Sequence, residues 1–100
     1  MPTIRVSVPH KLTQDEALKR VRKAIDAAKK QHPEKVPDLK ETWDGYEGSF
    51  SGSAMGNSLA GTLAVEPDEV TVEGKLPLLA MPFKGKIESA IQDTLKRLLA

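Results

Sequence analysis

Residues 46–54 read YEGSFSGSA, and their strict alternation of apolar or small residues with polar ones decides the fold. Successive side chains of a strand point to opposite faces, so this pattern predicts a strand with one face on a core and the other in water. Burial on one side is typical of an antiparallel sheet. Gly48 and Gly52 leave gaps beside the aromatic rings on the apolar face. We expect either a helix or a ligand to fill these gaps.

Further strands are predicted on both sides of this stretch. Trp43 comes just before Asp44 and Gly45, the dipeptide best suited to a two-residue hairpin turn. The strand that ends at Trp43 is therefore expected to pair with the strand over residues 46–54. By the same alternation, the other strands are expected at residues 3–8, 39–43, 59–65 and 70–76.

Two helices are predicted from apolar residues that recur every three or four positions. The first begins at Thr13, which forms a capping box with Glu16, and ends before Pro33. The second runs from about Phe83 to Leu99, and its apolar stripe is too wide for an isolated surface helix. We expect this final helix to lie across the buried sheet face.

Its side chains would then settle over Gly48 and Gly52. If a cavity remains instead, we expect it toward Trp43, Tyr46 and the segment 76–83, where the final helix begins. The two alternatives differ in what the glycine gaps are for, a seat for a helix or a pocket for a ligand.

The predicted fold class is α+β, with the order β-α-β-β-β-β-α and both helices on one face of an antiparallel sheet of about five strands. One hundred residues suit a single domain, here 1–100. The order resembles a reduced helix-grip arrangement, in which a C-terminal helix clasps a curved antiparallel sheet. By this analogy the strand order is expected to be 1-5-4-3-2.

Composition excludes several classes of protein. The chain has no cysteine and a net charge of +1, and none of its apolar runs is long enough to span a bilayer as a helix. The residues after Met1 also lack the apolar run of a signal peptide, so a cytoplasmic location is expected. Basic residues of the first helix alternate with acids four positions away, which favours a solvated face over a nucleic-acid interface.

No constellation for catalysis emerges from the sequence. His10 and His32 stand beside prolines without a partner at metal-ligand spacing, and the serines lack a nucleophile elbow. We therefore expect no enzymatic activity, no catalytic residue, no metal site and no cofactor. The alternative, an enzyme using Tyr46, Glu41 or Glu47, has no spacing that selects a reaction.

The candidate site is the apolar segment 76–83 together with two lysines that follow it. Cations at a helix N-terminus oppose the positive end of the helix dipole, and such a broken local rule often marks a functional site. Three roles stay open for the segment: burial at the end of the core, a homo-oligomer contact, or contact with a lipid or polymer surface. The lysines would be merely solvated if the helix began nearer Ile87. The candidate ligand- or surface-binding residues are Trp43, Tyr46, Leu78, Leu79, Met81, Phe83, Lys84 and Lys86.

Several short motifs carry a family resemblance. They are Trp43-Asp44-Gly45, the Gly-x-Leu-x-Val pattern at residues 61–65, VTVEGKL at residues 70–76 and FKGKIE at residues 83–88. In their order along the chain they resemble the polyhydroxyalkanoic acid system protein family, small bacterial proteins encoded near polyhydroxyalkanoate synthesis genes. No catalytic residue is defined for that family, so none is carried over.

The resemblance implies a non-enzymatic accessory protein of polyhydroxyalkanoate metabolism that binds an apolar ligand, the granule surface or a partner protein. Burial of Leu78, Leu79, Met81 and Phe83 would drive this binding, while Lys84 and Lys86 would orient acidic groups. Granule association would follow. Two other functions stay open: a structural homodimer, and a small acyl-ligand carrier.

Overall fold

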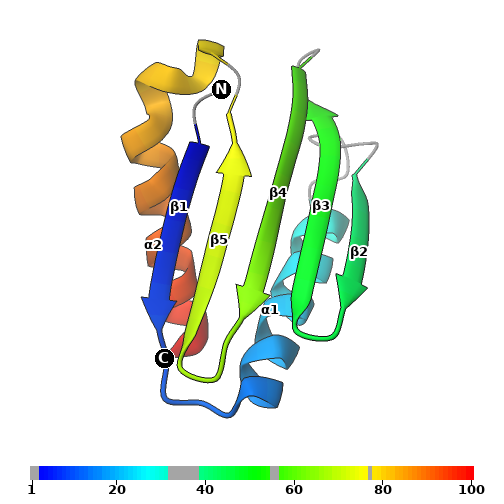
Figure 1. The fold of residues 1–100 in the computed structure, drawn as a ribbon, viewed down its shortest axis with the longest axis vertical. Coiled ribbons are helices and arrows are strands. Elements are labelled where there is room, and N and C mark those ends of the chain that lie inside the picture. Colours follow the sequence, from blue (N-terminus) through cyan, green and yellow to red (C-terminus); the bar gives the residue numbers. More distant parts are fainter. Residues whose placement is uncertain (1–2, 32–38, 55–56, 77) are drawn as a thin grey trace.

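The computed structural model describes residues 3–31, 39–54, 57–76 and 78–100. It has the predicted α+β class, with one five-strand sheet and both α-helices on the same side of it (Figure 1). The elements in chain order are β1 (Thr3–Pro9), α1 (Gln14–Gln31), β2 (Lys40–Asp44), β3 (Glu47–Ala54), β4 (Asn57–Val65), β5 (Glu69–Lys75), the 3-10 helix η1 (Leu78–Phe83) and α2 (Lys84–Leu99).

The strand order is β1-β5-β4-β3-β2 with every pair antiparallel, which confirms the predicted order. Strands β2 to β5 form a meander, and β1 completes the sheet by pairing with β5, with Val6 opposite Val72. The helices cover one face, while the other face carries mostly polar side chains. In β1 this alternation is complete, because Ile4, Val6 and Val8 are buried and the residues between them are exposed.

The strand registers arrange the helix-covered face in rows that run across the sheet. One row passes from β1 to β2 through Val6, Val72, Leu63, Gly48 and Trp43. The next row, toward η1, passes through Ile4, Gly74, Gly61, Phe50 and Glu41. Two glycines are thus direct neighbours at the centre of the second row. The helix-covered surface of the sheet is recessed at this glycine pair, because neither residue has a side chain.

The hydrophobic core lies on the same helix-covered face. It is on the side of the first row that faces away from the two glycines, toward the end of β1. Val65 and Val70 on the sheet and Val21 on α1 are almost completely buried there, and Leu95 of α2 belongs to the same cluster. Arg20 ties the two helices together, because its Nη1 donates to the carbonyl oxygens of Leu98 and Ala100. The core therefore holds both helices at this end of the sheet.

The prediction that the final helix lies over Gly48 is wrong. A Cβ built on Gly48 would meet three carbon atoms of the Trp43 indole at 3.0 Å, so a side chain of the neighbouring strand fills this gap. Helix α2 packs chiefly against β1, at the opposite edge of the sheet. Trp43 stands directly across from Gly48 in the β2–β3 register, and a large ring covers a residue without a side chain most easily from that position.

Helix α1 begins as predicted, but its cap has only one of the two expected hydrogen bonds. The N–H of Glu16 donates to Thr13 Oγ1 at 3.1 Å. The Glu16 carboxylate accepts instead from Arg20 Nε, one turn further along the helix. The predicted stop at Pro33 lies outside the described residues, and the described helix ends at Gln31.

Candidate functional site

Four of the eight predicted site residues come together where η1 leads into α2. Met81 and Phe83 keep 46% and 54% of their surface exposed, which is unusual for large apolar side chains. Lys84 and Lys86 follow in the first turn of α2, so the helix does not begin nearer Ile87. We call these four residues the η1–α2 patch.

Among the described residues, no group compensates the positive end of the α2 dipole. No side chain caps it, and its first turn contains no acidic residue. The positive end of the helix dipole and the two lysines therefore add up to a local positive field beside two exposed apolar side chains. Leu78 and Leu79 belong to η1, but their side chains lie outside what the structure describes.

Trp43 does not join the patch, because it is held on the helix-covered face of β2. Its ring meets Phe50 edge-on, with the ring centroids 5.9 Å apart and an interplanar angle of 90°. The guanidinium of Arg22 lies 5.3 Å from the indole centroid, within cation–π range. Its Nε1–H donates to the Glu41 carboxylate at 2.5 Å. Trp43 is thus a packed residue whose polar atom already has a partner.

Glu41, considered from the sequence only as a possible catalytic residue, holds β2 against α1. It lies on the same parity as Trp43, with 13% of its side chain exposed, and it accepts a second hydrogen bond from Lys29 Nζ at 2.8 Å. Burial would raise the pKa of Glu41, but the hydrogen bonds from Lys29 and Trp43 and the nearby positive charges outweigh it, and the pKa lies below its ordinary value. The ion pair fixes β2 to α1.

Tyr46 lies in the β2–β3 turn, at the opposite end of the sheet from the start of α2 (Figure 1). Its hydroxyl donates to Asp15 Oδ1 at the beginning of α1. This hydrogen bond, with a smaller contribution from burial and the charge of Asp15, raises the pKa of Tyr46. Tyr46 and the η1–α2 patch therefore cannot belong to one site.

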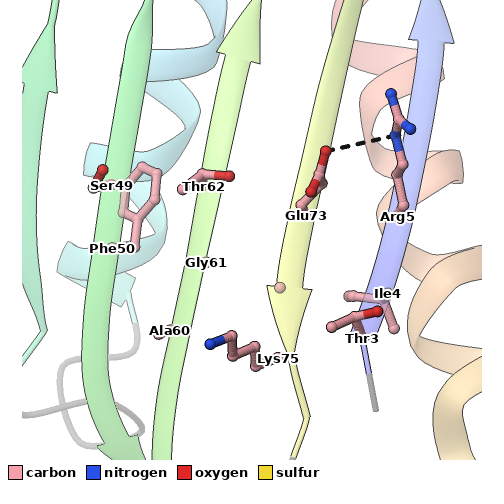
Figure 2. Close-up of a pocket in the computed structure, with 11 residues that line it drawn as sticks. Thr3, Ile4, Arg5, Ser49, Phe50, Ala60, Gly61, Thr62, Glu73 and Lys75 are labelled. Atoms are coloured by element: carbon pink, nitrogen blue, oxygen red, sulfur yellow. Dashed lines mark ion pairs between the residues drawn. The ribbon is translucent and has the colours of Figure 1, made fainter. Parts of the chain in front are cut away.

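A shallow hollow of about 500 Å³ lies on the face of the sheet that the helices leave uncovered. Figure 2 shows Arg5 of β1 and Glu73 of β5 as an ion pair across two strands, with Lys75 extending toward β4 beside Ala60. The Arg5–Glu73 distance is 3.6 Å and both side chains are mostly exposed, so this pair adds little stability. The hollow has the character of a solvated sheet face.

A second, smaller hollow of about 230 Å³ lies on the helix-covered face, at the pair formed by Gly61 and Gly74. The side chains that reach into it are almost entirely apolar. The residues of this face that line it are Ile4, Leu39, Phe50, Gly52, Leu59, Gly61, Gly74 and Leu76. The sequence predicted that any remaining cavity would lie toward Trp43, Tyr46 and the segment 76–83; this hollow reaches Leu76, but Trp43 and Tyr46 do not line it.

His10 is buried, and both of its ring nitrogens have backbone partners. Nδ1 accepts from the N–H of Leu12 at 3.1 Å, so Nε2 carries the proton and donates to the carbonyl oxygen of Glu66 at 3.0 Å. The imidazole thus joins the β1–α1 loop to the β4–β5 turn.

The His and acidic side chains of the described residues form no group of three or more that could hold a metal ion. Within the same part of the chain, no helix is long and apolar enough to cross a membrane.

The fold defines the class: a small two-layer α+β protein whose five-strand antiparallel sheet carries two helices on one face. Within this class the chain belongs to the family described as putative polyhydroxyalkanoic acid system protein, whose model matches residues 4–99. The match includes every described element except the first residue of β1. No curated protein matches the chain.

Proposed function

We propose that this chain is a non-enzymatic accessory protein of polyhydroxyalkanoate metabolism that binds the surface of the polymer granule through the η1–α2 patch. The observation that carries this proposal is the exposure of Met81 and Phe83 beside Lys84 and Lys86 at an uncapped helix start. The polymer is a polyester of hydroxy acids with carboxylate chain ends. An apolar patch with a positive field fits both parts of that chemistry.

The energy available from the patch can be worked out from its exposure. Complete burial of a Phe or Met side chain contributes about 1.5–3 kcal/mol, and roughly half of each side chain is still exposed here. Each would then contribute about 1 kcal/mol on binding, and the two together about a factor of 30 in affinity. Such a contribution suits reversible attachment to a surface.

The absence of an activity is part of the proposal. The imidazole of His10 has no free nitrogen that could act as a base. Within the described chain, Glu41 is engaged by Lys29 and Trp43, and the Tyr46 hydroxyl is engaged by Asp15. These engagements support a binding role over a catalytic one.

Sedimentation with protein-free particles of poly-3-hydroxybutyrate tests the proposal. The wild type should pellet with the particles, and the double variant Met81→Ser/Phe83→Ser should bind about 30-fold more weakly. Tyr46→Ser is the matched control, because Tyr46 is also an exposed ring (37%) but lies at the other end of the sheet. A wild type that stays in the supernatant, or equal binding by all three proteins, would overturn the proposal.

The lysines are tested in the same assay by varying the salt concentration. Lys84→Ala/Lys86→Ala should bind particles more weakly than wild type at low salt, and the difference should disappear at high salt because the charges are screened. Equal salt dependence in both proteins would remove the lysines from the proposed site.

A further inference from the structure

Gly74 lines the hollow on the helix-covered face, although the backbone conformation there does not require a glycine. A Cβ built on Gly74 would lie 3.5 Å from the carbonyl oxygen of Ala60 and 3.6 Å from Ile4 Cγ1, which are ordinary van der Waals distances. The φ angle of Gly74 is not in the positive region that favours glycine. An alanine would therefore fit at position 74 without a clash.

The neighbouring glycines differ from Gly74 in this respect. A Cβ on Gly61 would come within 2.9 Å of the Glu73 carbonyl oxygen, and one on Gly48 would press against the Trp43 ring. Both need glycine for packing. Glycine in a strand interior weakens the strand, because it loses the most conformational entropy and packs no side chain. What Gly74 contributes in return is empty space beside Ile4.

That space has the properties of a small apolar binding site. Ile4, Leu59, Leu76 and Phe50 line it, and it offers an apolar volume of about 230 Å³ that is open to solvent on one side. It lies beyond the core cluster, which is closed by α1 and α2 at the other end of the sheet. Neither lysine of the η1–α2 patch lines it.

We propose that this hollow binds the aliphatic chain of a monoacyl compound, with the chain lying over Gly74 and the polar end in water. The ligand class follows from the surface of the hollow, which is almost entirely apolar although Ser51 and Lys75 belong to its lining, and from its open side, which leaves the polar end in water. The size of the hollow selects short or medium chains. This site is separate from the granule-binding patch and does not depend on it.

Ligand titrations with sodium hexanoate, octanoate and decanoate, followed by thermal denaturation and by amide NMR, test this site. A ligand that binds only the folded state raises Tm. Octanoate should raise the Tm of the wild type and shift the amide signals of residues around Gly74. Gly74→Val keeps the sheet geometry but places two methyl groups in the hollow, so its affinity for octanoate should fall at least tenfold.

Gly85→Ala is the matched control, because a Cβ at Gly85 in α2 meets no atom within 4 Å and adds a methyl group away from the hollow. It should bind octanoate as the wild type does. Gly74→Ala distinguishes a loss of space in the hollow from a loss of folding stability. It should fold at least as stably as wild type while binding octanoate more weakly. No change in the wild type with any of the three acids, or equal affinity in wild type and both Gly74 variants, would overturn the proposal.

The proposed acyl site and the proposed granule-binding patch can be refuted independently of each other. Met81→Ser/Phe83→Ser should still bind octanoate with wild-type affinity, because neither side chain lines the hollow. Conversely, Gly74→Val should still sediment with polymer particles. Loss of octanoate binding in the Met81/Phe83 variant would show that the acid binds at the patch, which would also overturn this proposal.

Discussion

Replacing Gly48 by alanine should destabilise the protein through one identifiable contact, the face of the Trp43 ring. The new Cβ would lie 3.0 Å from three indole carbon atoms, closer than carbon atoms pack. The ring cannot move freely, because Glu41 holds its nitrogen and Phe50 meets it edge-on. Overpacking of this kind costs about 1–3 kcal/mol, against a gain of about 0.4–1 kcal/mol from restricting the unfolded chain.

The net loss of about 1–2 kcal/mol corresponds to a decrease in Tm of roughly 5–15 °C for a domain of this size. A double-mutant cycle isolates its cause. In the background Trp43→Leu the clash is absent, so Gly48→Ala should be neutral or slightly stabilising, and the two substitutions should couple by at least about 1 kcal/mol. Urea denaturation of the four proteins gives the coupling energy. Equal destabilisation by Gly48→Ala in both backgrounds would refute the reasoning, because the steric conflict would then lie elsewhere.

Two other groups give predictions of their own. Because the pKa of Glu41 is lower in the folded state than its ordinary value, its contribution to stability is complete above the unfolded pKa of about 4.3 and is lost as the pH falls through the folded pKa. Urea denaturation between pH 6 and 3 should therefore show a steeper loss for wild type than for Glu41→Gln; parallel curves would contradict this. Replacing His10 by alanine should cost about 1–3 kcal/mol, because it leaves the Leu12 N–H and the Glu66 carbonyl without their partner; a change below about 0.5 kcal/mol would show that water replaces the ring.

The sequence alone predicted the architecture because the deciding signals are local. Alternation with period two identified the strands and their faces, and the stripe from Phe83 to Leu99 identified the final helix. The Asp44-Gly45 dipeptide located the β2–β3 hairpin, where Gly45 has a φ of +62°. Such patterns depend on neighbouring residues only, so the sequence is sufficient to read them.

The contacts around Trp43 could not be predicted in the same way. The seat of the indole over Gly48 depends on the β2–β3 register, and the Lys29–Glu41 ion pair depends on where α1 lies over β2. One signal was present: Glu41 shares the parity of Trp43, so an acidic residue faces the covered side of the sheet and requires a partner there. Sequence spacing does not say which cation supplies it.

The candidate site was predicted in part. The sequence indicated the segment before the final helix, and the structure places Met81, Phe83, Lys84 and Lys86 together at its start. Trp43 and Tyr46 were expected in the same region, but Trp43 packs against Phe50 and Arg22, and Tyr46 lies in the β2–β3 turn at the other end of the sheet. The special position of Gly74 is visible only from interatomic distances, because its neighbour Gly61 is thirteen positions away in sequence and adjacent in the sheet.

The pairing of β1 with β5 has a consequence for how the chain is made. Residues 3–9 find their partner in residues 69–75, so β1 has no strand to pair with until most of the chain has left the ribosome. The meander β2–β5 is built from adjacent hairpins, whereas the closing pair must bring distant segments together, which is the slow kind of contact. The strand nearest the N-terminus, with Val6 and Val8, is thus expected to join the sheet after the meander has formed.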